Sequence, residues 1–366
     1  MEIIYKDKKD ISYLEYKISS ERKFINGISS IPGSGFFLYS DNYWGMISLL
    51  EQYENKIDLV YIDPPFNTNS KFFYHQNRTS TISYGKDDVL AYDDNMEFHT
   101  YLEFIRERLV LIHKLLSNEG TLYFHIDIKV GHYIKILLDE IFGRENFIND
   151  ITRVKSNPKN FKRKAFGNEK DVIFVYSKKE GMNIFNDIKK ELSEDEILNR
   201  FPKKDKDGRQ YTTIPCHAPG ETIKGDTGKM WKGLMPPKGR HWRCSPDELT
   251  KLDEQGLIEW SKNNVPRIKK FANEHTGKKI QDIWKEFKDP QNPIYPTEKN
   301  SDMLDLIIKQ SSNRGSIIMD CFCGSGSFLS AGIKNNRIVI GIDKSDAALS
   351  VIKNKEELKD INIISI

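Results

Sequence analysis

The feature that most limits the fold is an alternation of short apolar runs with amphipathic helical patterns, present near both ends of the chain but not in the middle. Ile57-Asp58-Leu59-Val60-Tyr61-Ile62 has the length and β-branched composition of a buried parallel strand. Such alternation predicts an α/β fold with helices on the faces of one sheet. The expected strands cover residues 36–39, 57–62, 121–126, 172–176, 316–319 and 337–342, and the expected helices residues 43–53, 98–116, 133–142, 245–255, 299–311 and a stretch from Phe328.

The charge is divided unevenly along the chain. The net charge of +3 consists of −7 for residues 1–150, +10 for residues 151–243 (22 basic against 12 acidic residues) and 0 for the remainder. The basic block is rich in Asn, Gly and Pro, which indicates long loops. We therefore expect an N-terminal segment (1–30), one half of the α/β domain (31–180), a basic insert facing a polyanion (181–280) and the other half of the domain (281–366). A solvated basic surface without a partner is the alternative.

Composition also sets the expected compartment. No apolar run approaches the ~20 residues that cross a bilayer, and the first ten residues are charged. Four cysteines in 366 residues do not make a disulfide framework. We expect a cytoplasmic protein with no membrane partner.

A glycine loop near the C-terminal end predicts a nucleoside site. Gly324 and Gly326 follow an expected strand and precede an expected helix, and Asp343 ends the next strand, where its carboxylate can accept hydrogen bonds from ribose hydroxyls. Leu329 stands where a dinucleotide loop has its third glycine, and Asp320 places an acid at the strand end. Asp320 would repel a pyrophosphate but attract an α-amino group, so S-adenosylmethionine fits better than NAD.

The tetrapeptide Asp63-Pro64-Pro65-Phe66 suggests chemistry on an amino group. An exocyclic amine of a base is a poor nucleophile because its lone pair is delocalised into the ring. The Asp63 carboxylate and the Pro64 carbonyl would accept its two hydrogens, the two prolines would stiffen the loop, and Phe66 would stack on a base extruded from the duplex. Alone, the motif also fits a stiff structural turn. If the strands ending at Asp63 and Asp320 are adjacent, cofactor and amine would face each other.

Together these motifs resemble the β-class DNA amino-methyltransferases of bacterial restriction-modification systems, close to the adenine-specific and type III modification enzymes. The Asp-Pro-Pro-aromatic element comes first and the Phe-x-Gly-x-Gly loop near the C-terminus, as in that family, and the resemblance covers residues 38–176 and 282–348 and parts of the insert. It implies a Rossmann-like methyltransferase sheet with permuted motif order, interrupted by a basic target-recognition insert. It implies Asp63, Pro64, Pro65 and Phe66 as catalytic residues, and as cofactor-binding residues Asp41, Thr297, Lys299, Asp320, Cys321, Phe322, Cys323, Gly324, Gly326 and Asp343.

Some of these assignments rest on the resemblance alone. Tyr295-Pro296-Thr297-Glu298-Lys299 is similar to a His-Pro-Thr-Gln-Lys segment that embraces the methionine end of the cofactor, with Tyr295 and Asn300 departing from the family's His and Pro. Asp41 matches an acidic position near the cofactor but also fits an N-cap of the next helix. Asp63 in place of Ser favours adenine over cytosine, as a tendency of the family.

The basic segments predict DNA contacts, because cations bind phosphates and aromatic rings stack on bases. Phe161, Trp231 and Trp242 stand among them, and the stretch from His217 to Arg243 resembles a segment of adenine-specific relatives. Cys216, His217, His241 and Cys244 would be zinc ligands under an alternative reading, but their spacing is unusual for zinc and we predict no metal. The expected DNA-binding residues are Arg153, Lys155, Lys162, Arg163, Lys164, Lys232, Arg240 and Arg243.

The sequence thus predicts an enzyme that methylates the N6 amino group of adenine in double-stranded DNA by base flipping, with S-adenosylmethionine as cofactor. Alternatives are an N4-cytosine methyltransferase, a nucleic-acid-binding module without catalysis and, more distantly, a nicotinamide dehydrogenase. A cognate restriction endonuclease and a homodimer are partners implied by the resemblance.

Overall fold

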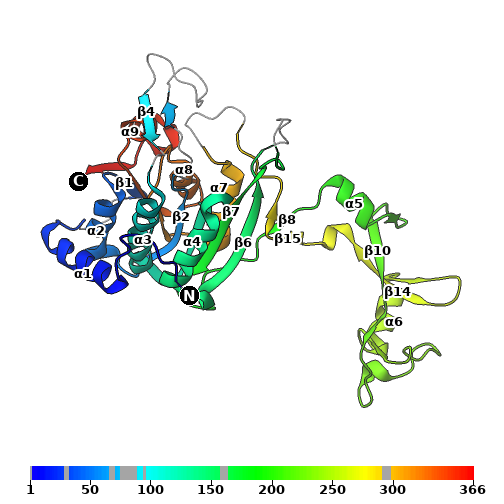
Figure 1. Ribbon diagram of the computed structural model, residues 1–366. Helices are drawn as coiled ribbons and strands as arrows, with labels where there is room; N and C mark the ends of the chain where they lie inside the picture. Colours follow the sequence, from blue (N-terminus) through cyan, green and yellow to red (C-terminus); the bar gives the residue numbers. More distant parts are fainter. Residues whose placement is uncertain are drawn as a thin grey trace. The chain divides into compact units, whose positions relative to one another are not determined.

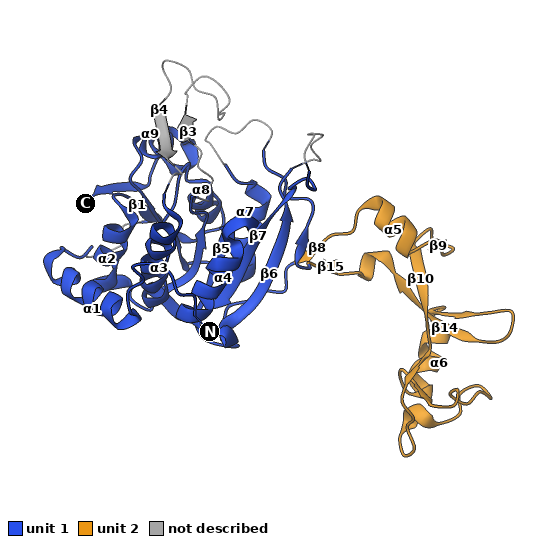
Figure 2. Ribbon diagram, in the orientation of Figure 1, with its two compact units in different colours: residues 1–188, 281–366 blue, residues 189–280 orange. Residues whose placement is uncertain are grey.

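The computed structural model describes residues 2–28, 33–65, 96–156, 164–290 and 298–366, together with the backbone of 71–74 and 89–93. The described chain divides into two compact units, coloured separately in Figure 2. Unit 1 comprises residues 1–188 and 281–366, and unit 2 comprises residues 189–280. The predicted insert, residues 181–280, overlaps unit 2 but starts eight residues earlier than Lys189.

Unit 1 is built on a nine-stranded sheet within the part of the chain that the structure describes. All neighbouring strands are parallel except β7, which is antiparallel to both β5 and β6. The strand order is β16 (Ile283–Trp284), β6 (Phe147–Val154), β7 (Lys170–Ser177), β5 (Leu116–Ile126), β2 (Ile57–Ile62), β17 (Ile317–Asp320), β18 (Ile338–Asp343), β1 (Gly35–Tyr39) and β19 (Asn362–Ser365). This sheet confirms the predicted α/β fold, with strands from both ends of the chain side by side.

Helices cover both faces of this sheet (Figure 1). Connections between parallel strands are right-handed, so the direction of each step along the sheet fixes the face of its helix. The steps β1 to β2, β2 to β5 and β5 to β6 run one way, and the steps β16 to β17, β17 to β18 and β18 to β19 run the other. One face therefore carries α2 (Asn42–Tyr53), α3 (Phe98–Leu115) and α4 (Ile128–Phe142), and the other α7 (Ser301–Ser311), α8 (Ser327–Lys334) and α9 (Asp346–Asn354).

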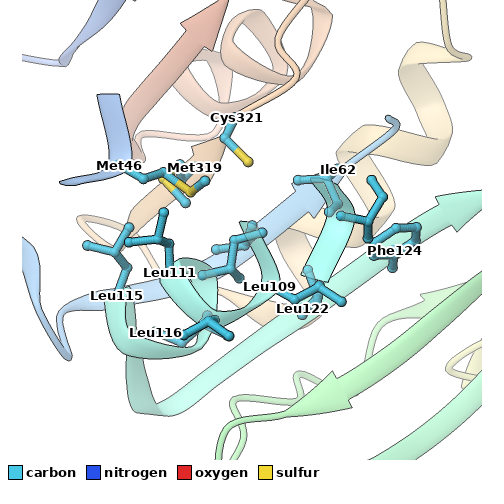
Figure 3. Packing of buried hydrophobic residues seen from close by; sticks show 14 of the residues in the cluster. Met46, Ile62, Leu109, Leu111, Leu115, Leu116, Leu122, Phe124, Met319 and Cys321 are labelled. Atoms are coloured by element: carbon cyan, nitrogen blue, oxygen red, sulfur yellow. The ribbon is translucent and has the colours of Figure 1, made fainter. Parts of the chain in front are cut away.

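The main hydrophobic core lies between the sheet and the first helix layer (Figure 3). Leu109, Leu111 and Leu115 of α3 pack over Leu122 and Phe124 of β5 and over neighbouring side chains of β17, all of them buried. Burying a leucine or phenylalanine side chain contributes about 1.5–3 kcal/mol, so this layer holds the ends of β2, β5 and β17 in place.

Several elements escaped prediction. The segment 1–30, left unassigned, contains α1 (Ile11–Glu21), which buries only Leu14 and Ile18 and so shows a weak apolar pattern. Helix α4 starts at Ile128, earlier than expected, because Asp127 caps it by accepting from the Lys129 amide at 3.0 Å. An antiparallel pair, β3 (Lys71–Tyr74) and β4 (Val89–Asp93), follows β2 in the chain.

Unit 2 has a small antiparallel sheet and its own core. The sheet contains β13 (Ile258–Trp260), β14 (Pro266–Phe271), β10 (Gln210–Pro215) and β9 (Lys203–Lys204). The predicted helix at 245–255 is α6 (Pro246–Glu254), which starts with a capping box formed by Ser245 and Glu248. The remaining elements are α5 (Glu194–Arg200) and two strand pairs, β11 (His217–Pro219) with β12 (Arg240–Trp242) and β8 (Lys189–Lys190) with β15 (Lys278–Lys279). Among the described residues of either unit, none of the helices combines the length and apolarity that crossing a membrane requires.

Candidate active site

The two predicted site loops follow neighbouring strands. Strands β2 and β17 are parallel, with Ile318 opposite Leu59 and Met319 opposite Val60. The chain leaves β2 toward one face of the sheet and β17 toward the other, and ligands of open α/β sheets bind where neighbouring connections diverge in this way. Asp63 follows β2, and Asp320 is the last residue of β17. The adjacency that the two-part site requires is therefore present.

Asp320 is a buried acid at the strand end. Its side chain is 4% exposed, and Oδ1 accepts from the Phe322 amide at 2.9 Å. Burial raises the pKa of this carboxyl well above its usual value, and the nearby Asp63 and Asp343 add to the effect. A cationic ligand group beside Asp320 would lower this pKa again, since an opposite charge stabilises the ionised carboxylate.

Asp343 closes the loop from the next strand. Its Oδ2 accepts from the Gly324 amide and its Oδ1 from the Ser345 amide, both at 2.8 Å. Burial raises the pKa of Asp343. Each carboxylate oxygen has a second lone pair and can still accept a hydroxyl hydrogen. The arrangement fits a ribose-binding acid.

The glycines of the loop have a packing role as well. Gly324 and Gly326 adopt φ values of +49° and +70°. A Cβ at Gly326 would lie 2.8 Å from Leu358 Cδ1, so this close contact and the positive φ both favour glycine at this position. The expectation that glycine admits a ligand is not needed to explain Gly326.

The side chains between these residues point into the protein. Cys321 and Cys323 are 1% and 5% exposed, and burial raises the pKa of both thiols well above the usual value. Figure 3 shows Cys321 among the core side chains, and its carbonyl accepts from Asn42 Nδ2 at 2.9 Å. Phe322 packs edge-on against Phe104, with 6.2 Å between ring centroids. A role for these two cysteines in cofactor binding would therefore fall to their backbone.

Asp41 lies at the same edge of the sheet, directly after β1 and Ser40. It caps α2 by accepting from the Tyr43 amide at 3.0 Å, and it pairs with Arg108 at 3.2 Å and Lys344 at 3.1 Å. Although burial raises the pKa of Asp41, Arg108 and the Tyr43 amide more than offset this and lower it. The N-cap alternative is confirmed, and a second role beside Asp343 remains a prediction.

Asp63 is held by a lysine that we expected at the cofactor. Lys299 Nζ lies 2.8 Å from Asp63 Oδ2, and the two side chains are 10% and 15% exposed. The resemblance implies that Lys299 embraces the methionine end of the cofactor, whereas the structure pairs it with Asp63 of the predicted catalytic loop. Pro64 is buried and Pro65 half-buried, and the catalytic role expected of both stays a prediction. Phe66 and Thr297 lie outside the described residues, so the roles expected of them stay predictions.

A buried histidine that the sequence analysis did not identify, His125, lies close to Asp63. His125 on β5 has no exposed surface, and its Nδ1 lies 2.8 Å from the Tyr61 hydroxyl and 3.8 Å from Asp63 Oδ1. Its Nε2 lies 3.0 Å from Asp171 Oδ2, and Arg153 Nη1 lies 3.1 Å from the same oxygen. A histidine inside an otherwise apolar strand was the available signal, and the strand pattern alone gave it no meaning.

The basic segment after residue 150 differs from its predicted use. Arg153 has no exposed surface and bonds to Asp171, Asp289 and the Phe287 carbonyl. It lies opposite Asp171 in the β6–β7 pairing, so its role is to stabilise the sheet. The prediction that Arg153 contacts DNA is therefore wrong. Lys155 pairs with Asp127 at 2.9 Å. Lys164 is exposed, and Lys162 and Arg163 lie outside the described residues.

Unit 2 keeps some of its predicted cations on the surface. Arg240 and Arg243 are exposed, with Arg240 Nη1 3.2 Å from His217 Nδ1 and Arg243 Nε donating to the Pro215 carbonyl at 3.0 Å. Lys232 pairs with Asp253. These side chains remain predicted DNA contacts.

The aromatic residues of unit 2 belong to its core. Trp231 and Trp242 are each 2% exposed, and Trp231 stacks on Trp260 with 5.3 Å between ring centroids. The expectation that Trp231 and Trp242 stack on bases is thus wrong, since they hold unit 2 together. Cys216 packs in the same cluster, and the described residues contain no group of three His, Cys, Asp or Glu side chains that could hold a metal ion.

Comparison with known proteins finds DNA-modifying methyltransferases. The type II methyltransferase M.EcaI of Enterobacter cloacae is 39% identical over 358 residues, covering 96% of this chain and 75% of that protein. M.KpnI of Klebsiella pneumoniae, also a type II methyltransferase, is 24% identical and covers 88% of this chain and 82% of its own length. The StyLTI Mod subunit of a type III restriction-modification enzyme from Salmonella typhimurium is 24% identical over 80% of this chain, which spans 48% of that subunit.

The family assignment rests on a match over most of the chain. The profile of the DNA methylase family N6_N4_Mtase matches residues 57–354, a range that begins at β2 and includes Asp63, Asp320 and Asp343. Both predicted loops thus fall inside the matched region. The chain belongs to the DNA methylase family.

Proposed function

We propose that this DNA methyltransferase transfers the methyl group of S-adenosylmethionine to the N6 amino group of adenine in double-stranded DNA. The observation that carries the proposal is the position of Asp63 and Asp320 at the ends of two adjacent parallel strands whose connections diverge. An acid for the amino group and an acid for a cationic cofactor group then lie at one site.

The residues that would hold the cofactor fit its chemistry. Asp320 is a buried carboxyl that a cationic α-amino group would stabilise in its ionised form, and Asp343 retains lone pairs for ribose hydroxyls. When bound, the cofactor supplies an electrophilic methyl group on a sulfonium sulfur. The neutral buried thiols of Cys321 and Cys323 would not compete for this methyl group, because the thiolate is the nucleophilic form.

Asp63 would act on the amino group of the flipped base. Lys299 holds Oδ2, while Oδ1 is buried and has no hydrogen-bond partner among the described residues. We assign Oδ1 to one amino hydrogen and the Pro64 carbonyl to the other. Two acceptors draw electron density toward the nitrogen and orient its lone pair toward the methyl group. The choice of adenine over cytosine rests on the resemblance, through Asp in place of Ser at position 63.

The biological setting is proposed from the relatives. Two are type II methyltransferases and one is the Mod subunit of a type III restriction-modification enzyme. We infer that this chain protects DNA against a cognate restriction endonuclease, that it binds DNA partly through Arg240 and Arg243, and that it acts as a homodimer.

The proposal is tested by methyl transfer from tritium-labelled S-adenosylmethionine to phage DNA grown in a host without DNA methylation, followed by nucleoside analysis. We expect label in N6-methyl-2′-deoxyadenosine. Asp63→Ala should abolish transfer yet retain cofactor binding. Asp58→Ala is the matched control, because Asp58 lies on β2, the strand that Asp63 follows, and among the contacts described its side chain accepts only from Ser117 Oγ at 2.9 Å. Label in N4-methylcytosine, or full activity of Asp63→Ala, would contradict the proposal.

A further inference from the structure

A chain of buried polar side chains runs from Asp63 across neighbouring strands of the sheet. Tyr61 lies opposite Tyr123 in the β2–β5 pairing, and Arg153 lies opposite Asp171 in the β6–β7 pairing. Side chains two residues apart on a strand share a face. Tyr61, His125, Asp171 and Arg153 therefore project from one face of four adjacent strands, and their distances show that they meet.

The charges in this chain set the proton positions on His125. Burial alone would raise the pKa of Asp171, but His125 and Arg153 more than offset it and hold this pKa well below its usual value. Asp171 is therefore a carboxylate, which can only accept hydrogen bonds. The proton of a neutral His125 ring then sits on Nε2, facing Asp171, and the lone pair of Nδ1 faces Tyr61 and Asp63.

We propose that His125, backed by Asp171, takes up the proton that the target amino group releases to Asp63. This inference rests on the proposed function. As the amino nitrogen bonds to the methyl carbon, the bond between this carbon and sulfur breaks, and the electron pair of the broken bond stays on sulfur. The nitrogen, now cationic, gives a proton to Asp63 Oδ1, and this proton passes to His125 Nδ1. After the product leaves, the proton returns through Asp63 to water.

The geometry needs only a small movement to complete this path. His125 Nδ1 and Asp63 Oδ1 are 3.8 Å apart. A hydrogen bond forms at about 2.7–3.2 Å, so the Asp63 carboxylate must move by about 1 Å, and the Tyr61 hydroxyl must turn its hydrogen away from the Nδ1 lone pair that it occupies at 2.8 Å. Lys299 anchors the other oxygen of Asp63, so the carboxylate can turn without leaving the site. An imidazolium formed there would lie between the carboxylate of Asp171 and that of Asp63.

A histidine in this setting could instead serve only to satisfy buried neighbours. Replacing His125 by glutamine distinguishes the structural role from the proton-accepting role. Gln at position 125 can still donate an N–H to Asp171, so a structural role would be largely kept. It cannot carry an additional proton, so a proton-accepting role would be lost.

The test compares single-turnover methyl transfer by the full chain and by its variants, with saturating DNA and S-adenosylmethionine. For His125→Gln we expect at least a tenfold lower rate, with dissociation constants for cofactor and DNA within twofold of the original. The groups facing the ring are Tyr61 on β2, Asp63 after it and Asp171 on β7, with Arg153 and Lys299 beside the carboxylates.

His113→Gln is the matched control, because His113 is a half-buried histidine of the same unit that packs on Phe142 of α4. Asp171→Asn provides a second variant if His125→Gln folds poorly. Asp171→Asn should slow methyl transfer. The double variant His125→Gln/Asp171→Asn should be no slower than the slower single variant, because both changes interrupt the same relay.

An unchanged rate in His125→Gln, or a slower rate accompanied by weaker binding of cofactor or DNA, would overturn the relay. The parallel Asp63→Ala measurement separates this result from a failure of the proposed function. Activity of Asp63→Ala would refute the function itself, whereas an inactive Asp63→Ala beside a fully active His125→Gln refutes only the relay.

Discussion

Arg153→Met should destabilise unit 1 without weakening DNA binding. Arg153 has no exposed surface, and its guanidinium donates to the Phe287 carbonyl at 2.8 Å, to Asp171 at 3.1 Å and to Asp289. Methionine fills much of the volume but leaves Asp171 buried beside His125 alone. Removing one partner of a buried ion pair costs about 3–5 kcal/mol, because the remaining charge loses its compensation.

This loss should be visible in thermal unfolding. At roughly 2–4 °C per kcal/mol for domains of 150–250 residues, we expect Tm to fall by about 10 °C. A pH series adds a second readout. The low pKa of Asp171 stabilises the folded chain above the unfolded pKa of about 3.9, and this stability is lost as pH falls through the folded pKa. Without Arg153 the folded pKa of Asp171 rises toward or above its unfolded value, so this carboxyl contributes less stability at neutral pH, and the difference in Tm between the original chain and the variant should narrow as pH falls below about 3.9.

Lys164→Met is the control, because Lys164 is an exposed cation of the same basic segment. We expect it to leave Tm unchanged and to reduce the salt dependence of DNA binding by about one phosphate contact. If instead Arg153→Met keeps its Tm and shows weaker, less salt-dependent DNA binding, the burial argument fails and the original expectation of a phosphate contact is restored.

Three further predictions concern the loop and the insert. Asp320→Asn should weaken S-adenosylmethionine binding at least tenfold in calorimetry, while Asp302→Asn, an exposed change at the start of α7, should not. Gly326→Ala should lower the free energy of unfolding, measured with denaturant, more than Gly315→Ala does. Both glycines have positive φ, which costs alanine about 1–2 kcal/mol, but only at Gly326 would the new Cβ also lie 2.8 Å from another side chain. Replacing residues 191–277 by a short Gly-Ser linker should preserve cofactor binding and abolish DNA binding; loss of cofactor binding would contradict the independence of unit 1.

The sequence could predict the strands and the loops that carry Asp63 and Asp320, because apolar runs and glycine turns are local signals. It could not establish that β2 and β17 are neighbours, since strand adjacency depends on contacts distant in sequence. That adjacency is what turns two separate motifs into one candidate site.

Other errors share one physical cause. Charge and aromaticity are visible in sequence, but burial is not. Arg153 reads as a phosphate ligand until its partners Asp171 and Asp289 are known, and Trp231 reads as a base-stacking residue until its contact with Trp260 is known. His125 escaped notice for the converse reason, because its partners come from two other strands.

The strand order also explains why a large insert can separate the two halves of the site. Asp63 and Asp320 are 257 residues apart in the sequence, yet their strands pair directly. Unit 2 begins with β8 and ends with β15, and these pair with each other, Lys190 opposite Lys278. The chain thus enters and leaves unit 2 at one place, so the length and composition of the unit place no constraint on the sheet. If unit 2 recognises DNA, as the sequence predicts, its residues can diverge while the β2–β17 pairing keeps Asp63 and Asp320 at one edge of the sheet.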